Sequence, residues 1–165
     1  MNEELVQKVH DDWKEKGFPY YPKDEDWRNN IFKQLVNFRR DTLVDRRTKV
    51  IGQSAHGLNL AWSFMEHAWG IKCGKMHTPM AIWNDEEHLK KGINKILTGT
   101  FFQKKPAHKI TESDMRSMLR RYSGTQMVSN FRPTAAAAMY DIFVDKDSPL
   151  EGTTAGTVWD PSMGY

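Results

Sequence analysis

The residues best suited to metal chemistry lie in the segment HAWGIKCGKMH, where His67, Cys73 and His77 fall close together. A structural zinc site takes four nitrogen or sulfur ligands, usually in two tight pairs, and this segment supplies only one tight pair, Cys73 and His77. His56 or His88 would have to complete the set from other elements. The spacing therefore favours unrelated polar residues around a loop, and we expect no metal. A metal-dependent enzyme that uses His56, His67, Cys73 and His77 is the alternative.

Cys73 is also the one residue that could act as a thiol nucleophile. Such a nucleophile needs a nearby base and a third group that orients the base. No spacing of histidines or acids in this sequence specifies that arrangement, so we predict no catalytic residue. A single cysteine also rules out an internal disulfide framework and suits a reducing compartment.

Arginine and lysine gather in three stretches, NFRRDTLVDRRTK, FFQKKPAHK and MRSMLRRY. Basic surfaces neutralise backbone phosphates and gain affinity from counterion release, so these stretches could form a DNA-facing side. The arginines assigned to DNA contact are Arg39, Arg40, Arg46, Arg47, Arg120 and Arg121. Because Asp41 and Asp45 interleave the first stretch, the sequence slightly favours a solvated helix face over a DNA-facing side.

Length and composition set the broad class of protein. The chain has 165 residues, a formal net charge of +3 and 27% charged residues, which argues for an ordered domain with a mildly basic balance. The N-terminus is charged throughout, unlike a signal peptide, and no stretch approaches the roughly 18 apolar residues of a membrane span. We therefore expect a soluble cytoplasmic protein without a membrane partner.

Apolar periodicity predicts two helices in the first forty residues. Leu5, Val9 and Trp13 share one stripe of a helix from Glu3 to Lys16, which Gly17 ends. A second helix begins at Asp24, and we expect it to bury the face formed by Trp27, Ile31, Leu35 and Phe38.

Four further helices follow from apolar runs and end signals. We predict a buried helix from about Gly57 to Trp69 and a helix capped by Asn84 that stops at Gly99. Thr111 and Asp114 resemble a capping box for a helix closed by Gly124. Pro133 takes the first position of an alanine-rich helix.

The segment VSNFRPTAAAAMYDIFV, followed by VWDPSMGY, resembles an arrangement in phage and prokaryotic DNA amino-methyltransferases, which methylate adenine N6 or cytosine N4. In that family a phrase V-x-x-F-x-P-x-x-A precedes a helix, and a strand then leads into D-P-x-x-G-x-G-G-R. The matching residues are Val128, Phe131, Pro133, Ala136, Asp160, Pro161 and Gly164. Roughly residues 80–165 share this likeness.

The resemblance implies a fold class and a cofactor. The chain would be mainly α, with about five or six helices in a helical N-terminal domain, 1–148. Residues 149–165 would form a linker and the start of an incomplete Rossmann-like methyltransferase domain. Val158 and Trp159 would be its first strand, and Asp160, Pro161 and Gly164 would begin the glycine turn at S-adenosylmethionine. The family's Pro-Pro-aromatic catalytic motif does not occur, and most of the parallel sheet that would house the cofactor is missing, so we expect this chain to be inactive and to bind no cofactor by itself.

Two functions from different classes follow. The chain would be the N-terminal region of an S-adenosylmethionine-dependent DNA methyltransferase, inactive alone and contributing DNA contacts through its arginines. Alternatively it is a free-standing small helical module that binds DNA or another protein. A strand without its sheet exposes unpaired backbone groups, so residues 157–160 should pair with a second copy or a complementary chain, or be loosely held.

Overall fold

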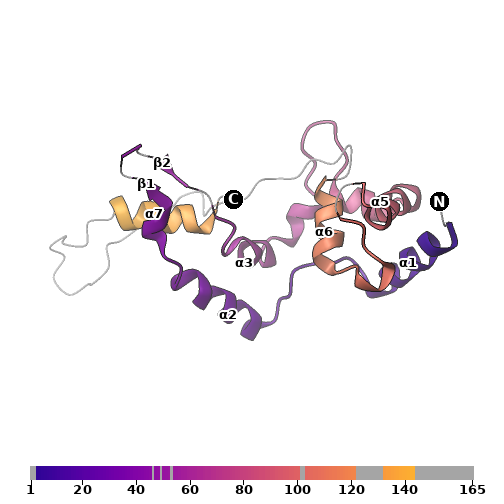
Figure 1. The fold of residues 1–165 in the computed structure, drawn as a ribbon, viewed down its shortest axis with the longest axis horizontal. Coiled ribbons are helices and arrows are strands. Elements are labelled where there is room, and N and C mark those ends of the chain that lie inside the picture. Colours follow the sequence, from indigo (N-terminus) through magenta and orange to yellow (C-terminus); the bar gives the residue numbers. More distant parts are fainter. Residues whose placement is uncertain are drawn as a thin grey trace. The chain divides into compact units, whose positions relative to one another are not determined.

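The computed structural model describes residues 3–45, 47–48, 50–52, 54–100, 103–121 and 132–143. Within these ranges the chain forms seven α-helices, three short 3-10 helices and a two-stranded antiparallel sheet (Figure 1). The mainly helical prediction is confirmed, and the described part already holds more helices than the five or six expected. The predicted Rossmann strand and the boundary at residue 148 lie outside the described residues.

Contacts divide the chain into two compact units. Unit 1 comprises Met1–Tyr20 and Met65–Val128, and unit 2 comprises Tyr21–Phe64 and Ser129–Tyr165. Each unit therefore combines two stretches that are far apart in the sequence. None of the helices in the described ranges has both the length and the apolar character that crossing a bilayer requires.

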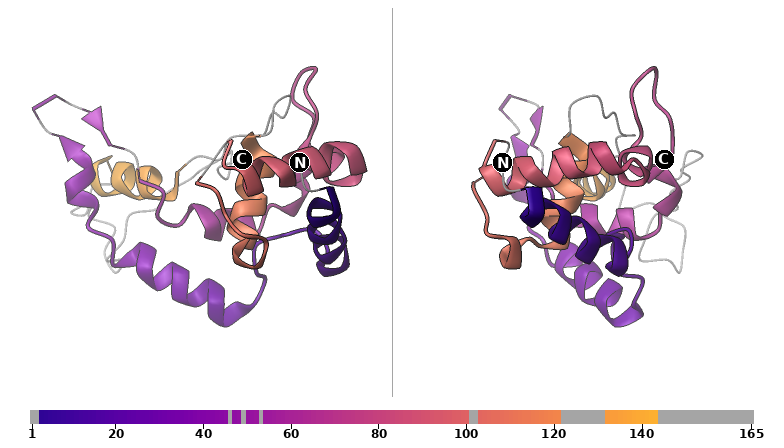
Figure 2. Two further views of the ribbon diagram at one scale, coloured as in Figure 1. Left: turned by 45° about the vertical axis from the view of Figure 1, so that its right-hand side comes forward. Right: turned by 90° about the vertical axis from the view of Figure 1, so that its right-hand side faces the viewer.

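Unit 1 is a helical cluster around one apolar core. Its elements are α1 (Glu3–Lys16), η2 (Glu66–Trp69), α4 (Pro79–Asn84), α5 (Glu86–Thr98), η3 (Ala107–Lys109) and α6 (Glu112–Arg121). α5 packs against α1, α4 and α6, and both views of Figure 2 show α1 beside α5. The core consists of buried apolar side chains from these elements: Val6, Val9, Trp13, Ile82, Trp83, Leu89, Ile93, Ile96, Leu97, Ile110, Met115, Met118 and Leu119.

Capping residues explain where the helices of unit 1 begin. The Thr111–Asp114 capping box is confirmed: the Asp114 carboxylate accepts from Thr111 N at 2.9 Å, and Asp114 N donates to Thr111 Oγ1 at 3.3 Å. The prediction of Asn84 as a helix cap is wrong, because Asp85 caps α5 by accepting from His88 N at 3.0 Å. Asn84 is instead the last residue of α4, a short helix that the sequence reading did not anticipate.

Gly92 sets the distance between α5 and α6. It is buried, and a Cβ at this position would lie 3.1 Å from Met118 Cε and 3.3 Å from Met118 Cγ, with Met118 Sδ closer still. Since Met118 is itself fully buried, no solvent space is available to receive its side chain. The absence of a side chain at Gly92 therefore permits this packing.

In the described part of unit 2, more residues are half-buried than fully buried. Its elements are α2 (Glu25–Val36), η1 (Arg40–Leu43), β1 (Val44–Asp45), β2 (Val50–Ile51), α3 (Leu58–Ser63) and α7 (Pro133–Phe143). β1 and β2 form a hairpin in which Val44 pairs with Ile51. α7 packs on η1, and α2 contacts α3. The start of α7 at Pro133 is as predicted.

Two expectations for unit 2 are corrected. The predicted apolar face is half-buried and not fully buried: Trp27, Ile31 and Leu35 on α2 are partly exposed, and so is Phe38, which lies beyond the end of the helix. The helix predicted from Gly57 to Trp69 is interrupted, because α3 ends at Ser63 and the chain turns at Phe64 and Met65 before η2. The apolar run that predicted one helix supplies residues to both units.

Candidate nucleic-acid interface

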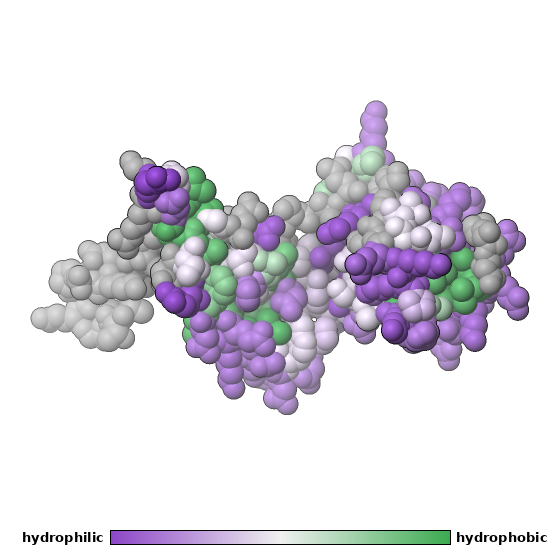
Figure 3. Space-filling view, in the orientation of Figure 1, coloured by the Kyte–Doolittle hydropathy of each residue, from purple (hydrophilic) through white to green (hydrophobic). Residues whose placement is uncertain are grey.

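Two adjacent hollows in unit 2 lie along α2 and share Gln34 and His56. The first, which we call the apolar hollow, has a volume of about 310 Å³ and is lined by Ile31, Gln34, Leu35, Ala55, His56, Gly57 and Asn59. The second, the basic hollow, has a volume of about 580 Å³ and is lined by Asn30, Lys33, Gln34, Asn37, Phe38, Arg39 and His56. Together we call them the α2 groove. The region of α2 is covered mainly by hydrophilic side chains (Figure 3).

α2 is anchored at its start and along its inner side. Asp24 caps the helix by accepting from Trp27 N at 2.8 Å. Arg28 donates to Ser63 O at 2.6 Å and to Ser63 Oγ at 3.1 Å, and its guanidinium lies 4.1 Å from the centre of the Phe64 ring. These contacts tie α2 to the end of α3 and leave the groove side of α2 open.

The segment 54–59 forms the opposite wall of the groove. The carbonyl oxygen of Ser54 accepts from Thr134 Oγ1 and from Arg132 Nη1, both at 3.3 Å, which attaches the segment to the start of α7. Gly57 has φ +74°, and a Cβ there would lie 2.9 Å from Leu35 Cδ2. Glycine is thus required both by the left-handed backbone and by the close approach to α2.

An aromatic pair lines the groove, with His56 in both hollows and Phe38 in the basic hollow alone. The rings of Phe38 and His56 are 4.4 Å apart between centroids and tilted by 35°. His56 Nδ1 lies 2.8 Å from Ser54 Oγ, so the ring is held on one edge while its other nitrogen remains for a further contact. Phe38 is half-buried and His56 is exposed. The pair therefore presents a fixed, partly open π surface to the groove.

Polar side chains of α2 are available for an external ligand. Within the described ranges, the side chains of Asn30, Lys33, Gln34 and Asn37 form no hydrogen bond or ion pair with the protein. They are exposed, and beyond the end of the helix lies Arg39, which is also exposed but already takes part in an interaction within the protein. A row of amides beside two cations can bind phosphates and base edges together.

The arginines predicted to contact DNA separate into two groups. Arg39 lines the basic hollow, and Arg47 is exposed in the β1–β2 turn, where its N–H donates to Asp45. Hydrogen bonds from the Thr48 side chain and backbone, and from Arg47 N, hold the pKa of Asp45 below its ordinary value. Asp45 is therefore ionised at neutral pH and partly offsets the Arg47 charge. Arg40 belongs to η1, its side chain lies outside the described residues, and so does Arg46.

Arg120 and Arg121 belong to unit 1, at the end of α6. The Arg120 guanidinium lies 4.9 Å from the centre of the fully buried Trp69 ring, which gives this side chain a packing role. Arg121 is exposed. Neither residue therefore belongs to the compact unit that contains Arg39.

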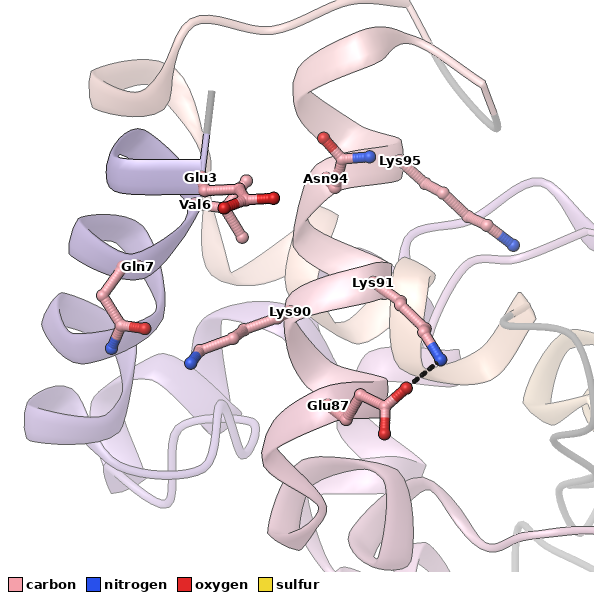
Figure 4. A pocket seen from close by; sticks show the side chains of 8 residues that line it. All are labelled: Glu3, Val6, Gln7, Glu87, Lys90, Lys91, Asn94 and Lys95. Atoms are coloured by element: carbon pink, nitrogen blue, oxygen red, sulfur yellow. Dashed lines mark hydrogen bonds and ion pairs between the residues drawn. The ribbon is translucent and has the colours of Figure 1, made fainter. Parts of the chain in front are cut away.

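A third hollow, of about 550 Å³, lies between α1 and α5 in unit 1 (Figure 4). Lys90 extends toward α1 and Lys91 points away from it. Each pairs with an acid one turn earlier in α5, Lys90 with Glu86 and Lys91 with Glu87. Hydrogen bonds from these lysines lower the pKa of both glutamates. Lys90 and Lys91 are therefore each matched by a carboxylate of the same helix, whereas Lys33 of the α2 groove forms no ion pair within the described ranges.

The metal hypothesis finds no support in the described geometry. No three histidine, cysteine, aspartate or glutamate side chains in those ranges lie close enough to hold an ion. His56 belongs to unit 2, whereas His67, Cys73 and His77 belong to unit 1. The residues assigned to S-adenosylmethionine, Asp160, Pro161 and Gly164, lie outside the described residues.

Comparison with protein-family models, with curated proteins and with solved structures finds no match for this chain. Sequence reasoning missed the Phe38–His56 pair and the amides of α2. The amides carried a usable signal, since Asn30, Gln34 and Asn37 recur at helical spacing on one side of the predicted helix. The ring pair carried none, because it depends on how segment 54–59 packs against α2.

Proposed function

We propose that this chain is a helical DNA-binding module that contacts DNA through the α2 groove. The observation that carries the proposal is the grouping of Lys33, Arg39 and three exposed amides along one groove of unit 2. Lysine and arginine supply the sequence-independent attraction to phosphates, and asparagine and glutamine can bond to base edges. The mildly basic net charge of +3 is compatible with this role.

The resemblance of residues 80–165 to DNA amino-methyltransferases points to the same ligand. In such an enzyme a helical region that binds DNA would hold the substrate for the S-adenosylmethionine-dependent domain. The motif residues that carry much of this resemblance lie outside the described ranges. The support that the resemblance gives therefore comes from the sequence and not from the structure. DNA contact through the α2 groove is the part of the proposal that the described residues support.

A binding titration tests the proposal. The affinity of the full chain for a short labelled DNA duplex is measured by fluorescence anisotropy at about 50 mM salt, where phosphate contacts contribute strongly. Replacing both groove cations, Lys33→Gln with Arg39→Gln, should weaken binding at least tenfold, because each lost phosphate contact costs roughly tenfold at this salt.

The matched control removes two exposed lysines of unit 1, Lys72→Gln with Lys75→Gln, and so changes the net charge equally. It should weaken binding less than threefold. Equal losses in the two double variants would show that only net charge matters and would reject the α2 groove as the contact site. No binding of either duplex or single-stranded DNA by the wild-type chain at low salt would reject DNA binding altogether.

A further inference from the structure

The two hollows of the α2 groove differ in the chemistry of their walls. The apolar hollow has aliphatic walls from Ile31, Leu35 and Ala55 and polar groups at Gln34 and Asn59. The basic hollow carries both cations, Lys33 and Arg39. An aliphatic slot with a few amides suits a flat heterocycle, whereas a solvated basic recess suits a phosphate.

We infer that the α2 groove binds an unpaired nucleotide of a DNA strand, with the base in the apolar hollow and the adjoining phosphate in the basic hollow. This inference rests on the proposed function and goes beyond it by naming single-stranded DNA as the ligand. Gln34 and His56 line both hollows, so they stand where the base joins its sugar and phosphate.

His56, which lines both hollows, supplies the stacking surface that an unpaired base in the apolar hollow requires, and Phe38 supports the His56 ring from the basic hollow. The two rings are in contact with their centroids 4.4 Å apart and their planes tilted by 35°, and the exposed His56 ring leaves a face for a base from the strand. Stacking is possible only when the base is free of its own helical stack, which is why proteins that bind single strands place aromatic side chains in a basic groove. A base-paired duplex can reach the cations but offers this surface no open base.

The side chains that would contact the base edges are amides. The apolar hollow presents Gln34, whose amide carries both a donor and an acceptor, and Asn59, whose Oδ1 already accepts from Leu60 N at 3.0 Å and whose NH₂ group can donate. An amide that offers both groups can therefore form hydrogen bonds with complementary donors and acceptors on the edge of any base. The arrangement favours recognition of an unpaired base over selection of one sequence, with adenine the best bidentate partner of an amide.

The test compares single-stranded and duplex DNA with the full chain and two ring variants. The probes are a short labelled oligothymidylate, a labelled oligodeoxyadenylate and a duplex of the same length. His56→Ala and Phe38→Leu should each weaken binding of the single strands at least fivefold, which is the lower end of the effect of losing one stacking partner. Binding of the duplex should change less than twofold.

The matched control is Phe32→Leu, because Phe32 is 54% exposed on α2 and lines neither hollow. It should leave all affinities within twofold. His56 is exposed, so His56→Ala keeps the test informative if Phe38→Leu disturbs the fold.

Four outcomes are distinguishable. Selective loss of single-strand binding in the ring variants supports the inference. Equal loss for duplex and single strand, or no loss for either, overturns it while leaving DNA binding intact. Failure of the wild-type chain to bind any DNA overturns the inference together with the proposed function. Binding of free thymidylate or deoxyadenylate as tightly as the oligonucleotides would overturn the assignment to a strand and show a mononucleotide site.

Discussion

Asp114 holds the start of α6 through both of its carboxylate oxygens. Oδ2 accepts from Thr111 N at 2.9 Å and from Thr111 Oγ1 at 2.7 Å, and Oδ1 accepts from Lys105 Nζ at 2.6 Å. The Asp114 side chain is only 16% exposed, so these bonds are partly shielded from water. They join the loop before α6 to the helix that supplies Met115, Met118 and Leu119 to the core of unit 1.

The pKa of Asp114 reports the strength of this arrangement. Burial by itself raises the pKa, but the hydrogen bonds from Lys105 and Thr111 outweigh burial, and the pKa lies below its ordinary value. A carboxylate with a lowered pKa in the folded state stabilises the protein at every pH above its unfolded pKa, near 4. That stabilisation is lost as the pH falls through the lower, folded pKa.

Replacing Asp114 with asparagine should therefore destabilise unit 1 in a pH-dependent way. The amide keeps the shape of the side chain but loses the charge that strengthens the bonds to Lys105 and Thr111. We expect the free energy of unfolding to fall by about 1–2 kcal/mol at pH 7, the usual range for a lost helix cap. The difference between the two proteins should shrink as the pH falls below about 4.

Urea unfolding followed by tryptophan fluorescence and far-ultraviolet circular dichroism measures this effect at pH 7 and at successively lower pH. The control, Asp12→Asn, removes one exposed carboxylate from α1 and should change the free energy of unfolding by less than about 0.5 kcal/mol. A deficit in Asp114→Asn that stays constant from pH 7 to pH 3 would refute the reasoning, because the cause would then not be the ionised carboxylate.

Two further changes test the packing of each unit. Gly92→Val should destabilise unit 1 by about 1–3 kcal/mol, since the new side chain would overlap buried Met118. Urea unfolding measures this loss. The control, Lys91→Val, places the same branched side chain at an exposed position of α5 and should destabilise the unit much less. Arg28→Met should speed amide hydrogen exchange in α3 by roughly 5- to 100-fold, because it removes both hydrogen bonds to Ser63. Unchanged exchange in α3 would show that Arg28 does not hold α2 in place.

The helices with local end signals were predictable from the sequence. α1 has its predicted bounds, and the Thr111–Asp114 box and Pro133 mark the starts of α6 and α7, because each signal is complete within a few residues. The N-cap of α5 was misassigned to Asn84 because the neighbouring Asp85 is an equally good cap by sequence. Only α4, a helix that was not predicted and that ends at Asn84, decides between the two residues.

The division into two units could not be predicted, because it depends on contacts between distant stretches. The segment from Leu58 to Trp69 is predominantly apolar, which is typical of one buried helix. It nevertheless forms α3 in unit 2 and η2 in unit 1. Arg39 was identified from its charge alone. Its neighbour His56 is seventeen positions away in the sequence and reaches the groove only because Gly57 lets segment 54–59 approach Leu35.

The central claim is that Lys33 and Arg39 contact DNA phosphates, and the salt dependence of DNA binding tests it most directly. The logarithm of the affinity for duplex DNA falls linearly with the logarithm of salt concentration, by about 0.9 for each phosphate neutralised. The variant with Lys33→Gln and Arg39→Gln should therefore show a slope shallower than that of the wild-type chain by about 1.8. Identical slopes for the two proteins would contradict the claim, because neither cation would then displace counterions from the DNA.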